Sequence, residues 1–375
     1  MKNLRLLVLA AMAAALAACG SPKPDTTVLM YVGSFTDAGG DGVYACRLDT
    51  VTGALSGLQS VATLKNPNYL TLSADGSRLY TYNNLRPDTA ELLTYAVDKT
   101  TGALTELARF KVPALTLSYV AMIEGGKWLG TVSFSEGKTL CYPLDAQGIA
   151  LDKPAIYVHT AFSNVNPQRQ DAPHAHSIEQ DPATGELYVP DLGADRTMIF
   201  SLKNDSLHLD AEVAYAPGAG PRHLAFHPSG NYMVTVNELD NTAALFARDS
   251  ARRFSRLLQT VSTLPETGWP EETTAADIHF TPDGKFLYAS NRGENSVAMY
   301  GFDEAYGTIT SLGNVREGID FPRNFVIDPS GKFLLVANQT GNDIVVYALD
   351  PVTGLLTITP NQIEVMGPSC LKFSL

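Results

Sequence analysis

The sequence predicts an all-β fold, a seven-bladed β-propeller with four-stranded blades. A short apolar segment that ends in small or polar residues recurs seven times, about every 50 residues, and this is the spacing of propeller blades. No segment shows sustained helical periodicity, so helices are not expected in the core. The two ends of the chain also complement each other, as a closed ring requires.

The repeated segment is the predicted second strand of each blade. Its seven copies are Met30–Phe35, Leu79–Asn84, Trp128–Ser133, Leu187–Leu192, Met233–Glu238, Leu287–Arg292 and Leu334–Gln339. A glycine-containing turn precedes the later copies, as in Asp283-Gly284, and another apolar strand lies before that turn. Each unit therefore contains a hairpin, followed by two further strands.

The chain ends predict how the ring closes. The first unit begins at its second strand, with no first strand before Val28. Residues 367–375 resemble a lone first strand, because their pattern matches Pro221–Phe226. We therefore expect the propeller to span residues 28–375, with the C-terminal strand joining the N-terminal blade and removing the open seam.

The N-terminus predicts a lipoprotein signal. Lys2 and Arg5 precede an apolar run at residues 6–18 that is too short to span a bilayer. Leu16–Gly20 resembles a bacterial lipobox, and the alternative is an ordinary signal peptide with a chance cysteine. We predict a signal peptide at residues 1–18, lipidation of Cys19 and a tether at 19–27. The expected location is the bacterial cell envelope, on the periplasmic side or at the outer membrane.

Composition narrows the possible partners. The formal net charge is −12, which argues against nucleic acid and against an anionic membrane surface. Membrane contact is expected only through the lipid anchor. Cys46, Cys141 and Cys370 lack metal-ligand spacing and are predicted to be buried free thiols, so the fold should not depend on disulfides.

One mouth of the predicted ring collects ionisable residues. The first and second strands of a blade are antiparallel, so the start of the first lies beside the end of the second. First-strand starts supply His176, Arg222 and Arg323. Second-strand ends supply Asp191, Glu238, Arg292 and Gln339. Corresponding positions in blades 1 to 3 hold Phe35, Asn68, Asn84, Ser133 and Ser369, so the charged groups gather over blades 4 to 7.

These residue types suit an anionic substrate with a reactive carbonyl group. Arginines bind carboxylate or phosphate through two hydrogen bonds and stabilise an oxyanion. A neighbouring His or Glu transfers protons near neutral pH. The alternative is that Arg and Glu side chains simply pair with each other and line a wet channel.

Metal binding is a less favoured interpretation, and no cofactor or metal is expected. His174 and His176 share a strand face, which is compatible with a metal ligand pair. Asparagines recur at one position of the repeat, as a calcium-dependent lactonase propeller would need, although strand termination is the favoured explanation. They are Asn83, Asn237, Asn291 and Asn338. His223 and Asp277 begin the inner strands of adjacent blades and are expected to pair behind the site.

Four ordered motifs carry a family resemblance. They are Gly220–Pro228, Val236–Leu239, Ala275–Gly284 and Pro322–Phe325. Together they closely resemble the seven-bladed propeller lactonase family, which includes bacterial 6-phosphogluconolactonases and fungal carboxymuconate cyclases. The resemblance covers about residues 28–375 and is densest over 172–345.

The resemblance implies a lactone hydrolase acting on an anionic sugar-acid or phosphosugar lactone. The cyclase branch of the family places a His, two Arg and a Glu at one mouth, which implies a catalytic set of His176, Arg222, Glu238 and Arg292. The base is either Glu238 or His176. Expected substrate ligands are His174, His223, Asp277, Arg323 and Gln339. The alternatives are a muconate-type cycloisomerase and a non-catalytic, ligand-binding propeller of the envelope.

Overall fold

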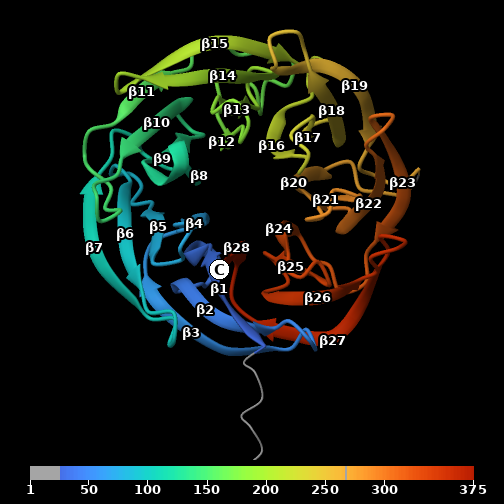
Figure 1. The fold of residues 1–375 in the computed structure, drawn as a ribbon, viewed down its shortest axis with the longest axis horizontal. Helices are drawn as coiled ribbons and strands as arrows, with labels where there is room; N and C mark the ends of the chain where they lie inside the picture. Colours follow the sequence, from blue (N-terminus) through green and yellow to red (C-terminus); the bar gives the residue numbers. More distant parts are fainter. Residues whose placement is uncertain (1–25, 267) are drawn as a thin grey trace, which may run out of the picture.

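The computed structural model describes residues 26–266 and 268–375. The predicted signal peptide and Cys19 lie outside these residues, and so does most of the predicted tether. Over the described ranges, strands form seven antiparallel four-stranded sheets arranged around a central axis. Figure 1 views this ring down its axis, with the sheets following one another in chain order. The seven-bladed propeller and its four-stranded blades are thus confirmed.

The blades have their strands in sequence order from the axis outward, apart from blade 1. Blade 1 contains β28 (Pro368–Ser374), β1 (Thr27–Ser34), β2 (Gly42–Asp49) and β3 (Leu55–Thr63). Blade 2 contains β4 (Leu70–Leu72), β5 (Arg78–Asn83), β6 (Glu91–Val97) and β7 (Leu104–Lys111). Blade 3 contains β8 (Tyr119–Ile123), β9 (Trp128–Ser133), β10 (Lys138–Pro143) and β11 (Ala155–Val158).

The remaining four blades carry most of the predicted site. Blade 4 contains β12 (Glu179–Gln180), β13 (Leu187–Asp191), β14 (Arg196–Lys203) and β15 (Ser206–Ala214). Blade 5 contains β16 (Pro221–Phe226), β17 (Tyr232–Asn237), β18 (Thr242–Arg248) and β19 (Phe254–Ser262). Blade 6 contains β20 (Thr274–Phe280), β21 (Phe286–Arg292), β22 (Ser296–Asp303) and β23 (Thr308–Val315). Blade 7 contains β24 (Pro322–Ile327), β25 (Phe333–Asn338), β26 (Asp343–Leu349) and β27 (Leu356–Glu364).

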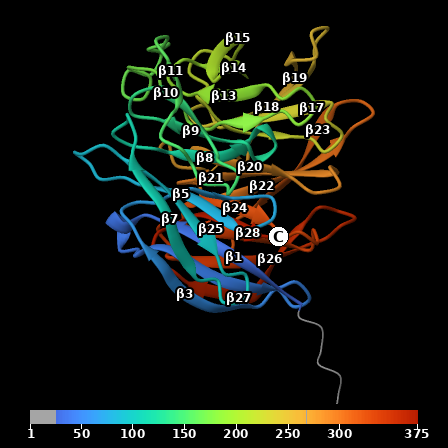
Figure 2. The ribbon, with the colours of Figure 1, turned by 60° about the vertical axis from the view of Figure 1, so that its left-hand side comes forward.

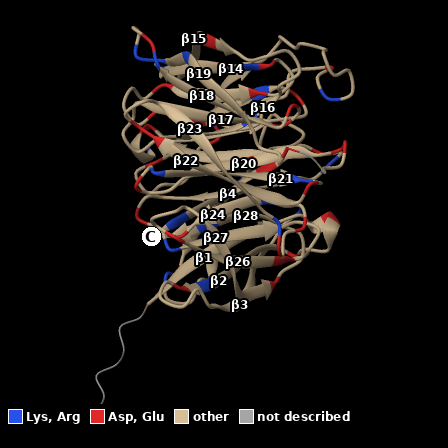
Figure 3. Ribbon diagram, turned by 90° about the vertical axis from the view of Figure 1, so that its right-hand side faces the viewer, with Lys and Arg blue, Asp and Glu red and all other residues tan. Residues whose placement is uncertain are grey.

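Helical structure is confined to two single turns in the described part of the chain, η1 (Thr36–Ala38) and η2 (Glu124–Gly126). None of the helices described is long and apolar enough to cross a membrane. Figure 3 shows acidic and basic residues interspersed over the turns at both faces of the disc.

The C-terminal strand closes the ring as predicted. Strand β28 pairs antiparallel with β1, from Leu29 opposite Ser374 to Ser34 opposite Pro368. The backbone N–H of Phe35 also donates to the carbonyl of Gly367 (2.8 Å). Figures 1 and 2 both show the two ends of the propeller meeting in this blade. The first blade is therefore held together by strands from opposite ends of the chain.

Tyrosines of the second strands connect neighbouring blades. Their rings are buried between the sheets, and the hydroxyls reach turns of the next blade. Tyr31 donates to the carbonyl of Gly102 (3.0 Å), and Tyr80 donates to that of Gly148 (2.6 Å). Tyr288 makes the equivalent bond to Gly354 (2.8 Å). The polar end of each ring is thereby satisfied while the apolar body fills the space between blades.

The three cysteines of the propeller are free and buried, as expected. Burial raises the pKa of the Cys46 thiol to about 12 and that of the Cys370 thiol to about 11. These thiols therefore stay protonated near neutral pH and behave as apolar core groups.

Candidate active site

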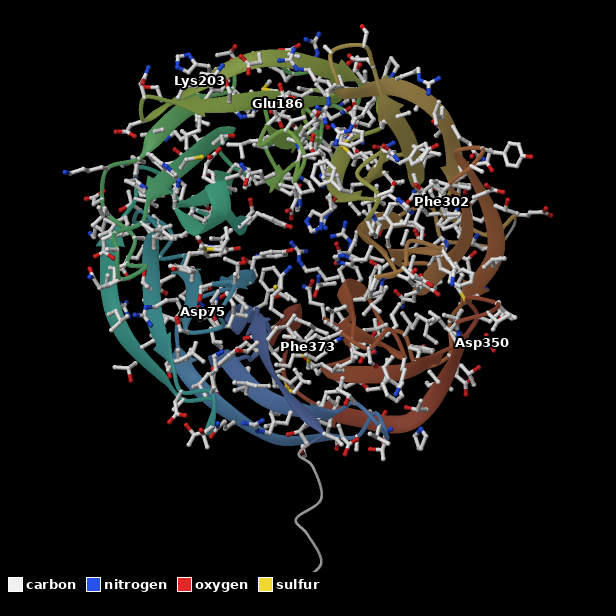
Figure 4. All side chains as sticks on the ribbon, in the orientation of Figure 1. Asp75, Glu186, Lys203, Phe302, Asp350 and Phe373 are labelled. Carbon is white, nitrogen blue, oxygen red and sulfur yellow. The ribbon has the colours of Figure 1, made fainter. Side chains whose placement is uncertain are left out.

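A cavity of about 530 Å³ opens at the mouth where the second strands end. Figure 4 shows nitrogen-bearing side chains projecting into the centre of the ring. We call this space the cationic cavity. It is lined by Phe35, Asp37, Lys65, Asn66, Asn68, Asn84, Arg86, Thr116, Leu117, Ser118, Phe134, Arg169, His176, Glu238, Arg292 and Arg323.

The cationic cavity differs in charge from the protein as a whole. Five of its lining residues are Lys or Arg, and two are Asp or Glu. The chain carries a formal net charge of −12, so this cavity is a local reversal of sign. A concave site with a positive lining concentrates anionic ligands.

Irregularities in three inner strands aim the key groups at the axis. A β-bulge lies between Pro221 and His223 in β16 and displaces Arg222 from the regular register. Strand β24 has the same irregularity at Arg323, and β20 has one between Ala275 and Ile278. Bulges reorient side chains beside functional sites. Here they turn two arginines and a pair of backbone carbonyls toward the channel.

Glu238 is held by three guanidinium groups. Its Oε2 accepts from Arg222 Nε (2.9 Å) and pairs with Arg292 Nη2 (2.9 Å), and its Oε1 accepts from Arg169 Nη2. Burial alone raises the pKa of Glu238, but the charges of Arg292, Arg222 and Arg169 outweigh it and leave the pKa far below its usual value. Glu238 is therefore an ionised anchor with both oxygens occupied.

Arg222 and Arg292 are also fixed from the opposite side. Arg222 Nη1 donates to the carbonyl of Ala276, and Arg292 Nη2 donates to that of Ala275 (3.1 Å). Both carbonyls belong to the bulge of β20. Burial and the nearby Arg292 lower the pKa of Arg222 to about 10, which still leaves it charged at neutral pH. The two guanidinium groups thus form a rigid clamp.

Arg323 makes no hydrogen bond to a described residue, and Arg292 Nε is also without a partner. Arg323 has no carboxylate partner among the residues described, and its guanidinium lies 4.8 Å from the ring centre of Phe35. Burial and the charges of Arg222 and Arg292 lower its pKa to about 9. An anion bound beside Arg323 relieves this repulsion, so Arg323 is well suited to hold a substrate charge.

His176 is buried and neutral. Burial, followed by the charges around it, lowers the pKa of His176 well below 6.5. Its Nδ1 has no partner, and no described residue is hydrogen-bonded to either ring nitrogen. Its backbone N–H donates to the carbonyl of Pro190 (2.9 Å), which fixes the segment before β12 that carries it. His176 therefore presents an imidazole with a free lone pair beside the arginine clamp.

The structure gathers the four predicted catalytic residues at one site. His176, Glu238 and Arg292 line the cationic cavity, and Arg222 lies directly beneath it with His176 and Arg323. Their roles in catalysis remain predictions. Of the residues expected from blades 1 to 3, Phe35, Asn68 and Asn84 line the cavity, whereas Ser133 and Ser369 do not.

The other predicted substrate ligands occupy different places. His174 stacks on Phe134, with ring centres 4.4 Å apart, and its Nδ1 contacts the Phe134 carbonyl (2.8 Å). It therefore lies behind Phe134, which lines the cationic cavity. Gln339 is absent from the described cavity lining. His223 and Asp277 line a second cavity of about 500 Å³ at the opposite mouth. Only Arg323 of this predicted set faces the cationic cavity, and the ligand roles of the others stay predictions.

Sequence analysis missed Arg169, which belongs to the connection between blades 3 and 4. That connection is longer than the others, and this extra length is the signal that could have revealed a loop over the mouth. Gln170 anchors the loop by donating to Asp195 Oδ1 (2.7 Å) and to the Leu192 carbonyl (2.9 Å). Arg86 and Lys65, from the loops of blade 2, had no comparable signal.

The recurring asparagines serve the fold. Asn291 Nδ2 donates to the Thr263 carbonyl (2.7 Å), and Asn338 Nδ2 donates to the Gly318 carbonyl (2.7 Å). Asn83 Oδ1 accepts from the backbone of Lys65 (2.6 Å). Within residues 26–266 and 268–375, no group of three or more His, Cys, Asp or Glu side chains is arranged to hold a metal ion. Loop anchoring therefore explains three of the four asparagines, whereas Asn237 donates to Thr242 Oγ1 (2.8 Å) and its Oδ1 has no partner.

Comparisons with known proteins agree with this architecture. The family description "Lactonase, 7-bladed beta-propeller" matches residues 29–373. A 6-phosphogluconolactonase of Bacillus subtilis is 32% identical over 350 residues, which cover 93% of this chain and 99% of the relative. A protein of the same name from Formosa agariphila is 31% identical over 80% of this chain and 86% of its own.

A solved structure is also similar over nearly its whole length. The periplasmic gluconolactonase of Pseudomonas aeruginosa superposes with a TM-score of 0.86 and 30% identity, covering 92% of this chain and 99% of that one. The match of the family description over almost the whole propeller and these identities lead to one conclusion. The chain belongs to the lactonase family of seven-bladed β-propellers.

Proposed function

We propose that this protein hydrolyses an anionic lactone, a sugar-acid or phosphosugar lactone, without a metal or organic cofactor. The observation that carries the proposal is a neutral, unpartnered His176 beside a rigid pair of arginines in a positively charged cavity. The names of the relatives, 6-phosphogluconolactonase and gluconolactonase, support the same reaction class.

In the proposed mechanism the cations divide into two roles. Arg323 and Arg86 bind the phosphate or carboxylate of the substrate, because neither is paired with a described carboxylate. Arg222 and Arg292 face the lactone carbonyl and stabilise the charge that develops on its oxygen. Glu238 keeps these two guanidinium groups in place, since Arg222 Nε donates to its carboxylate and Arg292 forms an ion pair with it.

His176 is the proposed base. It removes a proton from water as the water oxygen attacks the carbonyl carbon, and the tetrahedral intermediate then breaks the ring C–O bond. The same proton passes from His176 to the departing alkoxide, giving the hydroxy acid. Glu238 is a poorer candidate because both of its oxygens already accept from arginines, whereas His176 has free acceptor capacity.

The test is a panel of lactones assayed against the spontaneous hydrolysis rate. We expect kcat/KM to be highest for 6-phosphogluconolactone or muconolactone and lowest for uncharged gluconolactone, with no change in a chelator. Arg323→Met should raise KM for the anionic lactones by about 10- to 100-fold, because a hydrogen bond to a charged group contributes roughly 1.5–3 kcal/mol. KM for the neutral lactone should hardly change.

Arg196→Met is the matched control, since Arg196 pairs with Glu212 on an outer edge away from the cavity. Equal turnover of neutral and anionic lactones, or an equal effect of both arginine substitutions, would contradict the proposed selectivity. Interconversion of lactone and muconate without net hydrolysis would identify a cycloisomerase. Binding of the anions without turnover would identify a ligand-binding protein.

We further propose that the protein is a lipoprotein of the bacterial envelope, anchored through Cys19 after removal of residues 1–18. The lipobox-like sequence supports this, and the Pseudomonas relative is named as periplasmic. Cys19→Ser should abolish incorporation of labelled fatty acid and move the protein from the membrane fraction to the soluble or unprocessed pool. Undiminished labelling of the Cys19→Ser protein would refute the anchor.

A further inference from the structure

On the side away from the cationic cavity, Arg222 of the arginine clamp contacts His223. Arg222 Nη1 lies 3.1 Å from His223 Nε2, and His223 Nδ1 lies 2.8 Å from Asp277 Oδ1. All three side chains are buried, with residue exposures of 2%, 5% and 1% respectively. They form a continuous chain that begins just beneath the cationic cavity and ends near the opposite cavity.

The direction of these hydrogen bonds is fixed by chemistry. A guanidinium has only donors, so His223 Nε2 has to accept from Arg222 and cannot carry a proton. The proton of the neutral ring is then on Nδ1, where it donates to Asp277. Burial and the charge of Arg222 lower the pKa of His223 to about 3, which keeps the ring in this neutral form.

The other oxygen of Asp277 is committed elsewhere. Oδ2 accepts from Asn324 Nδ2, from His279 Nε2 (3.0 Å) and from the backbone of Phe325 (3.4 Å). Asn324 cannot reverse its amide, because its Oδ1 accepts from the backbone of Leu371 (2.8 Å). A fixed donor therefore faces Oδ2, and that side of the residue at position 277 has to remain an acceptor.

We propose that Asp277 is a positioning residue for the reaction, because it fixes the Nδ1–H tautomer of His223 and so maintains the acceptor that holds Arg222 toward the cavity. This inference rests on the proposed function for its catalytic consequence. It agrees with the expectation that His223 and Asp277 pair behind the site. It differs from the expectation that they contact substrate, since neither lines the cationic cavity.

Asp277→Asn tests the proposal by replacing one carboxylate oxygen with an NH₂ group. The donors of Asn324 and Phe325 require the asparagine oxygen on their side, so its NH₂ group faces His223 Nδ1. Only one backbone donor, Ile278 N–H (3.1 Å), favours the opposite orientation of the amide. His223 then protonates at Nε2, and two donors confront each other at Arg222. We expect kcat to fall by about 10²-fold, close to the loss of an oxyanion donor, and KM to change less than about threefold.

The tautomer is measured directly. Nitrogen-15 NMR of the protein labelled at histidine should show His223 protonated at Nδ1 in the wild type and at Nε2 in Asp277→Asn. The second substitution His223→Gln should restore much of the lost turnover in the Asp277→Asn background, because a glutamine oxygen can accept from Arg222 regardless of position 277. Asp181→Asn is the matched control, since Asp181 is a buried carboxylate that pairs with Arg248 away from the cavity.

Several outcomes would overturn the inference. An unchanged tautomer in Asp277→Asn, or a kcat loss no larger than that of Asp181→Asn, would leave Asp277 a structural residue. If the wild type hydrolyses no lactone, the proposed function fails separately. The positioning role is then judged from the His223 tautomer alone, which should still move from Nδ1 to Nε2 in Asp277→Asn. A His223 ring that stays protonated at Nδ1 in this variant would contradict it.

Discussion

His176→Gln is expected to lower kcat for the preferred anionic lactone by about 10²–10⁴-fold, the usual effect of removing a proton-transfer group. The amide keeps a polar side chain of similar length but cannot take a proton from water. Neither ring nitrogen of His176 has a hydrogen-bond partner among the residues described, so folding should lose little. Steady-state kinetics together with thermal unfolding separate the two effects.

The pH dependence provides a second measurement of the same residue. Burial and the neighbouring charges lower the pKa of His176 well below 6.5, so the basic form persists as the pH falls through 6.5. Wild-type kcat/KM should therefore show no acid limb near pH 6.5. The depressed pKa also predicts a stability loss below pH 6.5, because the unfolded chain binds a proton that the native protein excludes.

His208→Gln is the control for this substitution, because His208 is exposed on the outer strand β15 (Ser206–Ala214). It should leave kcat and the pH profile unchanged. A wild-type rate in His176→Gln would transfer the role of base to Glu238, and an acid limb at pH 6.5 would mean that His176 is solvated in the working enzyme.

The architecture followed from the sequence because propeller blades repeat. The recurring apolar segment marks one strand in every blade, and the antiparallel pairing of that strand with its predecessor brings their opposite ends together. This argument alone placed His176, Arg222 and Glu238 at one mouth. The lone first-strand pattern at residues 367–375 likewise led to the closure that β28 and β1 form.

The features that the sequence did not predict are loop contacts and strand irregularities, which the repeat does not encode. Arg169 reaches Glu238 from a loop, and its position depends on the buried Gln170 rather than on any strand register. The bulges of β16, β20 and β24 shift residues by one place, which no repeat alignment reveals. His174 has the right register for the mouth but stacks behind Phe134, because this aromatic residue from the preceding blade covers it.

Removing the closing strand is expected to have the largest effect on stability. Truncation after Gly367 eliminates β28, exposes the free edge of β1 and removes the buried side chains of Cys370 and Leu371. Each fully buried apolar side chain contributes about 1.5–3 kcal/mol, and the lost strand pairing adds to this. The sum is a large part of the roughly 5–15 kcal/mol that stabilises a typical protein.

The truncated protein should therefore aggregate or unfold at a much lower temperature, measured by circular dichroism and light scattering. The control is removal of Leu375 alone, which is 69% exposed and lies beyond β28. Adding a synthetic peptide of residues 367–375 should restore folding and activity, because the open edge of β1 offers the backbone groups that β28 normally pairs. A truncated chain that folds, melts and hydrolyses lactone like the full chain would mean that the other six blades hold the ring closed without it. The peptide would then have no effect, and the pairing of β1 with β28 would be a consequence of closure rather than its cause.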